Sequence, residues 1–231
     1  MATTTKKRKE IEKLVDKNKL YQLAEAIDIA IKSAKSKFDE SIEIHVALGV
    51  DPKKTNQQVR ASVTLPNGTG KTKVIACVAK GEKVREAQEA GADHTGEMDL
   101  VTKIAGGWLG FDVLIATPDM MKDLAKLGKI LGPKGLMPNP KTGTVTFDIA
   151  RTINEIKKGR VDFKADGQGN VHGSVGKASF GSEKILANAA AFYSAVMHAK
   201  PSDFKGVYVK SLAVCSTHGP GVRINFNNIE Q

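Results

Sequence analysis

Two kinds of hydrophobic pattern occur along this chain, and they constrain its fold more than any other feature. In residues 41–50 (SIEIHVALGV) and 59–65 (VRASVTL), apolar and polar residues alternate. Such alternation is typical of strands with one buried face and one face exposed to water. In residues 73–79 (KVIACVA) and 113–118 (VLIATP) the apolar runs are continuous, which indicates strands that are covered on both faces. The chain is therefore expected to contain two differently built sheets.

The alternating strands lie toward both ends of the chain. We expect the strands at 41–50 and 59–65 to pair with each other in antiparallel fashion. Half-exposed strand patterns return after residue 160, together with a long helix at about 182–199. Apolar residues at intervals of three and four predict two further helices, at 10–20 and 22–35.

The middle of the chain alternates continuous apolar runs with helical patterns. Helices are predicted at 82–92, 119–131 and 149–159. Strands that alternate with helices in this way are typical of a compact α/β unit with a largely parallel sheet.

This order of patterns predicts an α/β protein of two domains. The outer one, an α+β domain with a mainly antiparallel sheet, is formed by residues 1–67 and 160–231. The other is a Rossmann-like α/β domain, residues 68–159, inserted into the first. The chain then crosses between them near 67–70 and 158–160, where we expect hinges. A single continuous α/β domain is the alternative.

The charge of the chain points to a polyanionic partner. Lys and Arg number 35 against 25 Asp and Glu, which gives a formal net charge of +10. Nucleic acid is the commonest partner of such a basic chain. The basic excess is spread along the whole sequence, so it does not identify the binding face, and a merely soluble basic protein remains an alternative.

Several classes of protein find no support in the sequence. Residues 1–10 form a short basic arm without the apolar core of a secretory signal, and no apolar run is long enough to span a membrane. Cys77 and Cys215 are far apart in the sequence, and we expect them to lie reduced in strand cores, as is usual in the cytoplasm.

The motifs of enzymes and metal sites are also missing. The sequence GTGKT at 68–72 lacks the earlier glycine of a phosphate-binding loop, because Leu65 stands there, and it precedes a predicted strand. The five histidines show no local spacing typical of metal ligands, so no metal site is predicted. We find no nucleophile motif and no cofactor fingerprint, and we predict neither an enzyme nor a bound cofactor.

Small polar clusters border the predicted half-exposed strands. Phe38 follows Lys37 just before one strand, Lys177 and Ser179 end another, and Thr217 ends a third. An aromatic ring stacks on a base or ribose, lysines meet phosphates, and hydroxyls bind ribose 2′-hydroxyls. Each cluster alone is an ordinary turn, and Phe38 alone could be the first core residue. Together, in a basic chain, they favour an RNA-binding surface.

Four segments carry a resemblance to a known family. They are FDESIEIHVALGVDPKK, LGPKGLMPNPKTGTV, GKASF and STHGPG, in this order and spacing. The chain resembles, from about residue 5 to about residue 226, the ribosomal protein L-one family, the bacterial large-subunit proteins of the ribosome's mobile side stalk. The resemblance implies two hinged domains, the outer one formed by both chain ends and the other inserted into it.

The resemblance also implies a surface for RNA on the outer domain. Its predicted RNA-binding residues are Lys37, Phe38, Glu40, Lys164, Asp166, His172, Lys177, Ser179, Thr217, His218 and Gly219. Relatives usually have methionine in place of His218, and histidine would stack or donate a hydrogen bond there instead. Relatives also include proteins with lysine in place of Gly167.

The loop at 127–145 is rich in glycine, proline and lysine and has no acidic residue. Its glycines and prolines indicate a specified shape. We expect it to meet RNA as a secondary contact, through Lys134 and Lys141, and a purely structural role is the alternative.

The function implied by the resemblance is that of a non-enzymatic ribosomal protein. Its partners would be the stalk of the large-subunit rRNA, the deacylated tRNA whose movement and release from the exit site it aids, and its own-operon mRNA, whose translation it represses. It would act in the cytoplasm as a monomer within the large subunit, away from membranes. The rival hypothesis is a two-domain α/β enzyme that acts on an anionic small molecule in the interdomain cleft. That enzyme would need a catalytic dyad, which the sequence does not show.

Overall fold

The computed structural model describes residues 10–11, 14–16 and 19–226. The chain divides into two compact units, one of residues 1–70 and 161–231 and the other of residues 71–160. The basic arm and part of the helix predicted at 10–20 lie outside the described residues. Among the residues that are described, none of the helices combines the length and the apolar character needed to cross a membrane.

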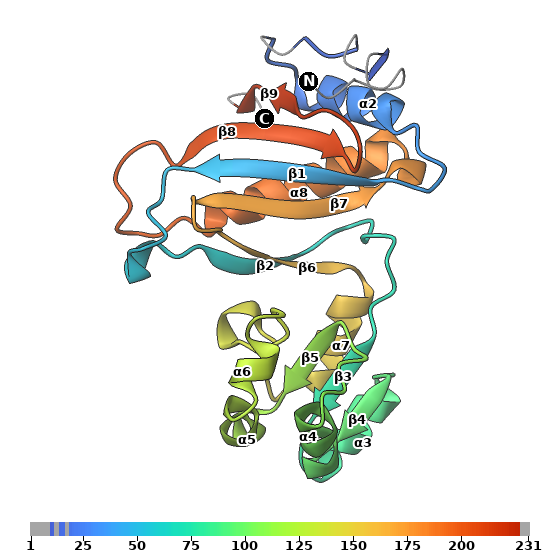
Figure 1. Ribbon diagram of the computed structural model, residues 1–231, viewed down its shortest axis with the longest axis vertical. Helices are drawn as coiled ribbons and strands as arrows, with labels where there is room; N and C mark the ends of the chain where they lie inside the picture. The colour runs from blue at the N-terminus through green and yellow to red at the C-terminus, as the bar shows by residue number, and fades with distance from the viewer. Residues whose placement is uncertain (1–9, 12–13, 17–18, 227–231) are drawn as a thin grey trace, which may run out of the picture. The chain divides into compact units, whose positions relative to one another are not determined.

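The first unit is built on a four-stranded sheet with the strand order β7-β1-β8-β9 (Figure 1). Its strands are β1 (Ser41–Leu48), β7 (Asn170–Lys177), β8 (Val209–Ser216) and β9 (Val222–Ile224). β1 pairs in antiparallel fashion with both β7 and β8, and β9 pairs with the other edge of β8. The chain therefore shows the predicted mixture of helices and strands with an antiparallel sheet.

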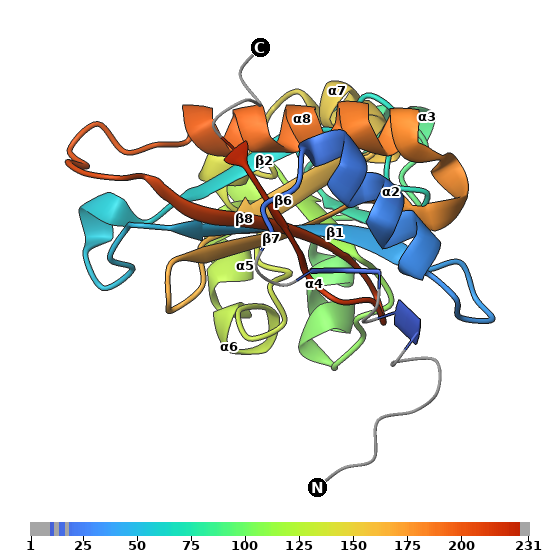
Figure 2. The ribbon, with the colours of Figure 1, turned by 90° about the horizontal axis from the view of Figure 1, so that it is seen from above.

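Two helices cover one face of this sheet. They are α2 (Leu23–Ser33) and α8 (Ser182–His198), and Figure 2 shows both on the same side of the strands. The apolar residues of β1 face them and are at most 2% exposed, namely Ile42, Ile44, Val46 and Leu48. The alternate residues Glu43 and His45 lie on the opposite, polar face, as the alternation in the sequence predicts.

The predicted pairing of the strands at 41–50 and 59–65 is wrong. The second of these, β2 (Arg60–Thr64), pairs instead with β6 (Arg160–Lys164) in a separate two-stranded sheet. Alternation shows which side chains of a strand are buried, but it does not identify the neighbouring strand. Both edges of β1 are occupied by β7 and β8, which, like β1, are eight residues long, whereas β2 has five.

The second unit contains a three-stranded parallel sheet in the order β4-β3-β5. Its strands are β3 (Ile75–Val78), β4 (His94–Gly96) and β5 (Val113–Ala116). Its helices are α3 (Glu82–Glu89), α4 (Met98–Ala105), α5 (Met121–Ala125), α6 (Gly128–Leu131) and α7 (Ile149–Lys157).

The continuous apolar run in β3 supplies two separate hydrophobic cores. Ile75 and Cys77 pack with residues of α3 and α7, whereas Ala76 and Val78 pack with residues of α4, α5 and α6. All four residues of this strand are 0% exposed. This arrangement confirms the prediction that the strand is covered on both faces.

The single helix predicted at 119–131 is interrupted. The chain forms a 3₁₀ turn at Pro118–Met120, then α5, and then the short α6. Between the two helices the amide of Leu127 bonds to the carbonyl of Leu124, at 2.9 Å, three residues back rather than four. Gly128 follows directly, and glycine costs a helix about 1 kcal/mol relative to alanine. Since Leu124 and Leu131 are both buried, the break still keeps the apolar side chains in the core.

The segment predicted as a loop at 127–145 begins with α6, and internal hydrogen bonds fix its later part. The side-chain oxygen of Asn139 accepts a bond from the backbone amide of Lys141, and the backbone amide of Asn139 donates to Thr144 Oγ1, each at 2.8 Å. Gly143 turns the chain with φ 64°, a value that favours glycine. Lys134 and Lys141 are exposed, so their contact with RNA stays a prediction.

Asn188 ties the chain that leaves the first unit to the core of that unit. It lies on α8 and is 0% exposed. Its amide nitrogen donates to the carbonyls of Gly68, at 2.9 Å, and Val175, at 2.7 Å. Its oxygen accepts a bond from the amide of Asn67 at 3.0 Å. All its hydrogen-bonding groups are therefore used on backbone.

Replacing Asn188 with alanine is expected to lower the free energy of unfolding by about 2–4 kcal/mol, because one buried and two partly buried backbone groups lose their partner. Urea unfolding measures this loss. Ser194→Ala, at an exposed position of the same helix, serves as the control and is expected to stay within about 0.5 kcal/mol of the original chain. Equal effects of the two substitutions would contradict the anchoring role of Asn188.

Candidate nucleic-acid interface

A buried carboxylate joins the segment before β1 to the turn after β8. Glu40 is 1% exposed. One of its oxygens accepts the amide of Ser36 at 2.9 Å, and the other accepts the amide of His218 at 3.0 Å. Burial acts to raise the pKa of Glu40, but the hydrogen bonds from His218 and Ser36 outweigh it and hold the pKa below its usual 4.5. The group is therefore a carboxylate at neutral pH.

The rings of Phe38 and His218 are in contact, one in each of the two segments that this carboxylate joins. Phe38 is 52% exposed, so the alternative that it is the first core residue is wrong. Its ring meets the ring of His218 edge to face, with 5.5 Å between the ring centres. Ser36 Oγ and His218 Nδ1 lie 3.1 Å apart and share a hydrogen bond. The two rings thus form an exposed aromatic pair, and the hydrogen bonds of His218 to Ser36 and Glu40 hold it in place.

Asp39 connects the same segment to the end of β7. Its carboxylate accepts two bonds from Ser179, one from the amide at 3.1 Å and one from the hydroxyl at 2.7 Å. Its carbonyl accepts a bond from Lys177 Nζ at 3.0 Å, and the same ammonium donates to Ser41 Oγ at 3.1 Å. Asp39 was not among the predicted residues, because its contacts with Ser179 and Lys177 join segments about 140 positions apart and leave no local pattern in the sequence.

Thr217 and Gly219 complete the group at the end of β8. Thr217 Oγ1 accepts the amide of Ser41 at 3.0 Å and donates to the carbonyl of Ser41 at 3.3 Å. A Cβ atom at Gly219 would collide with the hydroxyls of Ser33 and Ser216, which would have to move to admit a larger residue. We call Phe38, Lys177, Ser179, Thr217, His218 and Gly219 the strand-end surface.

Asp166 and His172 form a second group farther along the sheet. His172 lies opposite His45 on β1, four residues or about 13 Å from Ser41. Its Nε2 is 3.5 Å from a carboxylate oxygen of Asp166. Asp166 is held in turn by the amides of Gln168 and Asn170, at 2.8 and 2.7 Å. These hydrogen bonds, first that of Asn170 and then that of Gln168, lower the pKa of Asp166.

The other predicted residues take different positions. Lys37 and Lys164 are exposed on the first unit, and Lys134 and Lys141 are exposed on the second. Glu40 was predicted to bind RNA, but its buried carboxylate is already bonded to two backbone amides. Its role in this geometry is to position His218 and the segment that carries Phe38, rather than to touch a ligand.

The strand-end surface combines the groups that RNA binding requires. It presents an aromatic ring for a base or a sugar, an ammonium for a phosphate, hydroxyls for ribose, and a glycine turn whose backbone a ligand can approach closely. The internal hydrogen bonds of Ser179, Thr217 and Lys177 fix these groups before any ligand arrives, which lowers the entropy cost of binding.

The carboxylate of Glu40 is expected to make stability depend on pH. Because its folded-state pKa lies below the unfolded value of about 4.5, its contribution is full above that pH and is lost as pH falls through the folded pKa. Glu40→Gln leaves one of two buried amides without an acceptor and should cost about 1–3 kcal/mol at pH 7.

Urea unfolding of both chains between about pH 7 and pH 3 measures this dependence. The two stability curves should converge in acid, because only the original chain loses a carboxylate. A constant difference across that range would show that the charge of Glu40 plays no part.

A comparison with family models matches residues 30–220 to the family described as ribosomal protein L1p/L10e. The match covers most of the chain and includes all of the strand-end surface, from Phe38 to Gly219. It confirms the resemblance found in the sequence. The chain belongs to the ribosomal protein L1p/L10e family.

Proposed function

We propose that this chain binds the stalk of the large-subunit rRNA through the strand-end surface. Membership of the family supports the coarser statement that it is a ribosomal protein that binds large-subunit rRNA. The finer assignment, to the stalk and to these residues, is our proposal. It treats the first unit as the outer RNA-binding domain and the second as a domain inserted into it.

The observation that carries the proposal is the convergence of three distant segments. Residues 36–41, 177–179 and 216–219 meet around Glu40 and Asp39 through hydrogen bonds between residues up to 182 positions apart. The side chains left at the surface by this construction are the aromatic, cationic and hydroxyl groups that suit RNA. A turn that served only to connect strands would not require an exposed phenylalanine against a histidine.

Affinity and selectivity should come from different groups. The net charge of +10 favours binding to any polyanion and makes that binding sensitive to salt. Selectivity for a structured RNA should come from the fixed hydroxyls and the turn at Gly219, which fit ribose and backbone shape rather than charge alone.

We also propose the finer roles that family resemblance suggests. Bound to the stalk in the cytoplasmic large subunit as a monomer, the chain would aid the movement and release of deacylated tRNA from the exit site. The same surface would bind a similar structure in its own-operon mRNA and repress translation. The rRNA stalk and the own-operon mRNA would bind the same face, so binding of one would displace the other.

A binding assay tests the central proposal. Purified chain at moderate salt is titrated with an rRNA stalk fragment and, separately, with a shuffled RNA of the same length and composition. We expect at least about a thousandfold preference for the stalk fragment, which is at the lower end of specific over non-specific binding to nucleic acid. Equal affinity for the two RNAs would overturn the proposal, and competition by an RNA copied from the own-operon mRNA tests the repressor role.

Phe38→Ala is expected to weaken binding to the stalk fragment by about 1–3 kcal/mol, the usual effect of removing one stacking aromatic residue. The fold should be little changed, since this side chain is 52% exposed. Phe147→Ala is the matched control, because Phe147 is 56% exposed but lies in the second unit. Filter binding with both variants measures the effect. Equal losses of affinity in the two variants would show that Phe38 does not contact the RNA.

Lys37→Ala is expected to reduce the slope of log affinity against log salt concentration by up to about one, the change for a single lost phosphate contact. Lys205→Ala is the control. Lys205 is also exposed, but it lies in the loop before β8, at the opposite end of the sheet. A slope that Lys37→Ala leaves unaltered would mean that Lys37 contacts no phosphate.

A further inference from the structure

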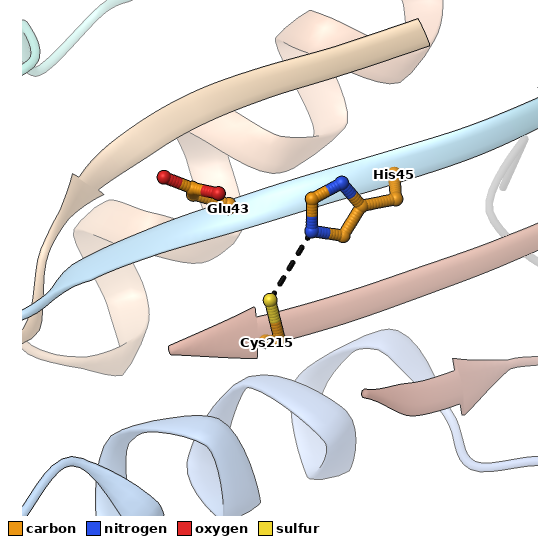
Figure 3. A group of neighbouring side chains, drawn as sticks. All are labelled: Glu43, His45 and Cys215. Atoms are coloured by element: carbon orange, nitrogen blue, oxygen red, sulfur yellow. Dashed lines mark hydrogen bonds between the residues drawn. The ribbon is translucent and has the colours of Figure 1, made fainter. Parts of the chain in front are cut away.

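Three side chains with metal-binding atoms gather on the polar face of the first unit's sheet (Figure 3). Glu43 and His45 are alternate residues of β1, and Cys215 of β8 lies directly across from Glu43. One ligand atom from each residue lies within 4.8 Å of the other two. His45 Nε2 and Cys215 Sγ are already 3.1 Å apart and share a hydrogen bond.

A chain of hydrogen bonds orients the imidazole of His45. His45 Nδ1 and His172 Nδ1 are 2.8 Å apart, so one of them donates a proton to the other. His172 Nε2 faces the carboxylate of Asp166 at 3.5 Å, which favours a proton on that nitrogen. With the proton on Nε2, His172 accepts at Nδ1, and His45 donates from its own Nδ1. This leaves the lone pair of His45 Nε2 directed at Cys215.

We propose that Glu43, His45 and Cys215 form a binding site for a divalent cation of the zinc class. A thiolate, an imidazole nitrogen and a carboxylate oxygen are the three ligand types that Zn²⁺ takes in proteins. A site with three protein ligands keeps a fourth position open for water or another ligand. Asp166 and His172 are then positioning residues, because the outer partner of a metal-binding histidine fixes its tautomer. The site stands independently of the RNA-binding proposal.

The three groups also suit a cation in charge. Cys215 would bind as a thiolate, with its proton released to solvent, and His45 as a neutral imidazole. A cation between Glu43 and Cys215 would offset the repulsion between carboxylate and thiolate.

The geometry needs only a small adjustment. Bond lengths of about 2.0–2.3 Å from zinc to its ligands place neighbouring ligand atoms roughly 3.3–3.8 Å apart in a tetrahedral site. His45 and Cys215 already meet this distance approximately, at 3.1 Å. The carboxylate of Glu43 has rotatable bonds with which to approach them. Ser174, opposite Glu43 on β7, has a buried hydroxyl oxygen without a hydrogen-bond partner among the described residues.

This cluster bears on two expectations from the sequence. Local histidine spacing predicted no metal site, whereas the ligands that we propose come from two strands whose members are 170 positions apart. Cys215 was expected in a strand core like Cys77, which is buried, yet it is only partly buried on the polar face. The strand pairing, which local sequence patterns do not give, creates the group.

Titration of the purified, untagged chain with Co²⁺ and then Zn²⁺ tests the proposal. We expect one metal ion per chain and an absorption band from cobalt bound to thiolate, which Zn²⁺ abolishes by displacement. Cys215→Ser should remove the band and weaken Zn²⁺ binding at least a hundredfold, although Cys77 is still present. His172→Gln should keep the band but weaken binding about 10–100-fold, as loss of an outer partner does.

His198→Gln is the matched control, because His198 is exposed at the end of α8, and it should leave Zn²⁺ binding unchanged. Circular dichroism checks that each variant folds, and Glu43→Gln provides a second ligand variant should Cys215→Ser fold poorly. In the original chain, Zn²⁺ should also slow alkylation of Cys215. The proposal is overturned if the original chain shows no thiolate–cobalt band, or if Cys215→Ser binds Zn²⁺ as tightly as the original chain.

Discussion

The carboxylate of Glu40 is the interaction on which the geometry of the strand-end surface depends. An ionised group that is 1% exposed is stable only when hydrogen bonds replace the lost water, and here the amides of Ser36 and His218 do so. Each amide belongs to a different segment, so the carboxylate is satisfied only when both segments are in place. The position of Phe38 against His218 follows from that requirement.

The central strand β1 serves two purposes through one alternation. Its apolar residues pack under α2 and α8, and its polar residues, Glu43 and His45, face the other way. A shift of one residue in its register would exchange these sets and bury the polar side chains. Packing of the hydrophobic core therefore also determines which side chains of β1 lie on the polar face.

The sequence predicted the elements of this fold better than their partners. Alternation in residues 41–50 gave the buried face of β1, and the continuous run in β3 gave its two cores, because each pattern reflects the surroundings of single residues. The pairing of β2 with β6 could not be predicted that way, since it depends on which edges of β1 are already occupied.

The candidate site shows the same division. Phe38, Thr217 and His218 were predicted because their residue types suit RNA and because the family resemblance marks them. The buried state of Glu40 and the contacts of Asp39 with Ser179 were not, because they depend on hydrogen bonds between segments far apart in the sequence. The chemical character of a residue can be inferred from the local sequence. Its burial, and its contacts with distant segments, are known only from the folded structure.

The discontinuity of the strand-end surface has a consequence for synthesis of the chain. Glu40 and His218 are 178 positions apart, and all of the second unit lies between them. At about 5–20 residues per second, a ribosome needs roughly 10–40 s to make the segment that separates them. Until then a nascent chain has Phe38 but not the turn that supports it. The strand-end surface can therefore form only after residue 219 has been made, and under our proposal RNA recognition by this face begins no earlier.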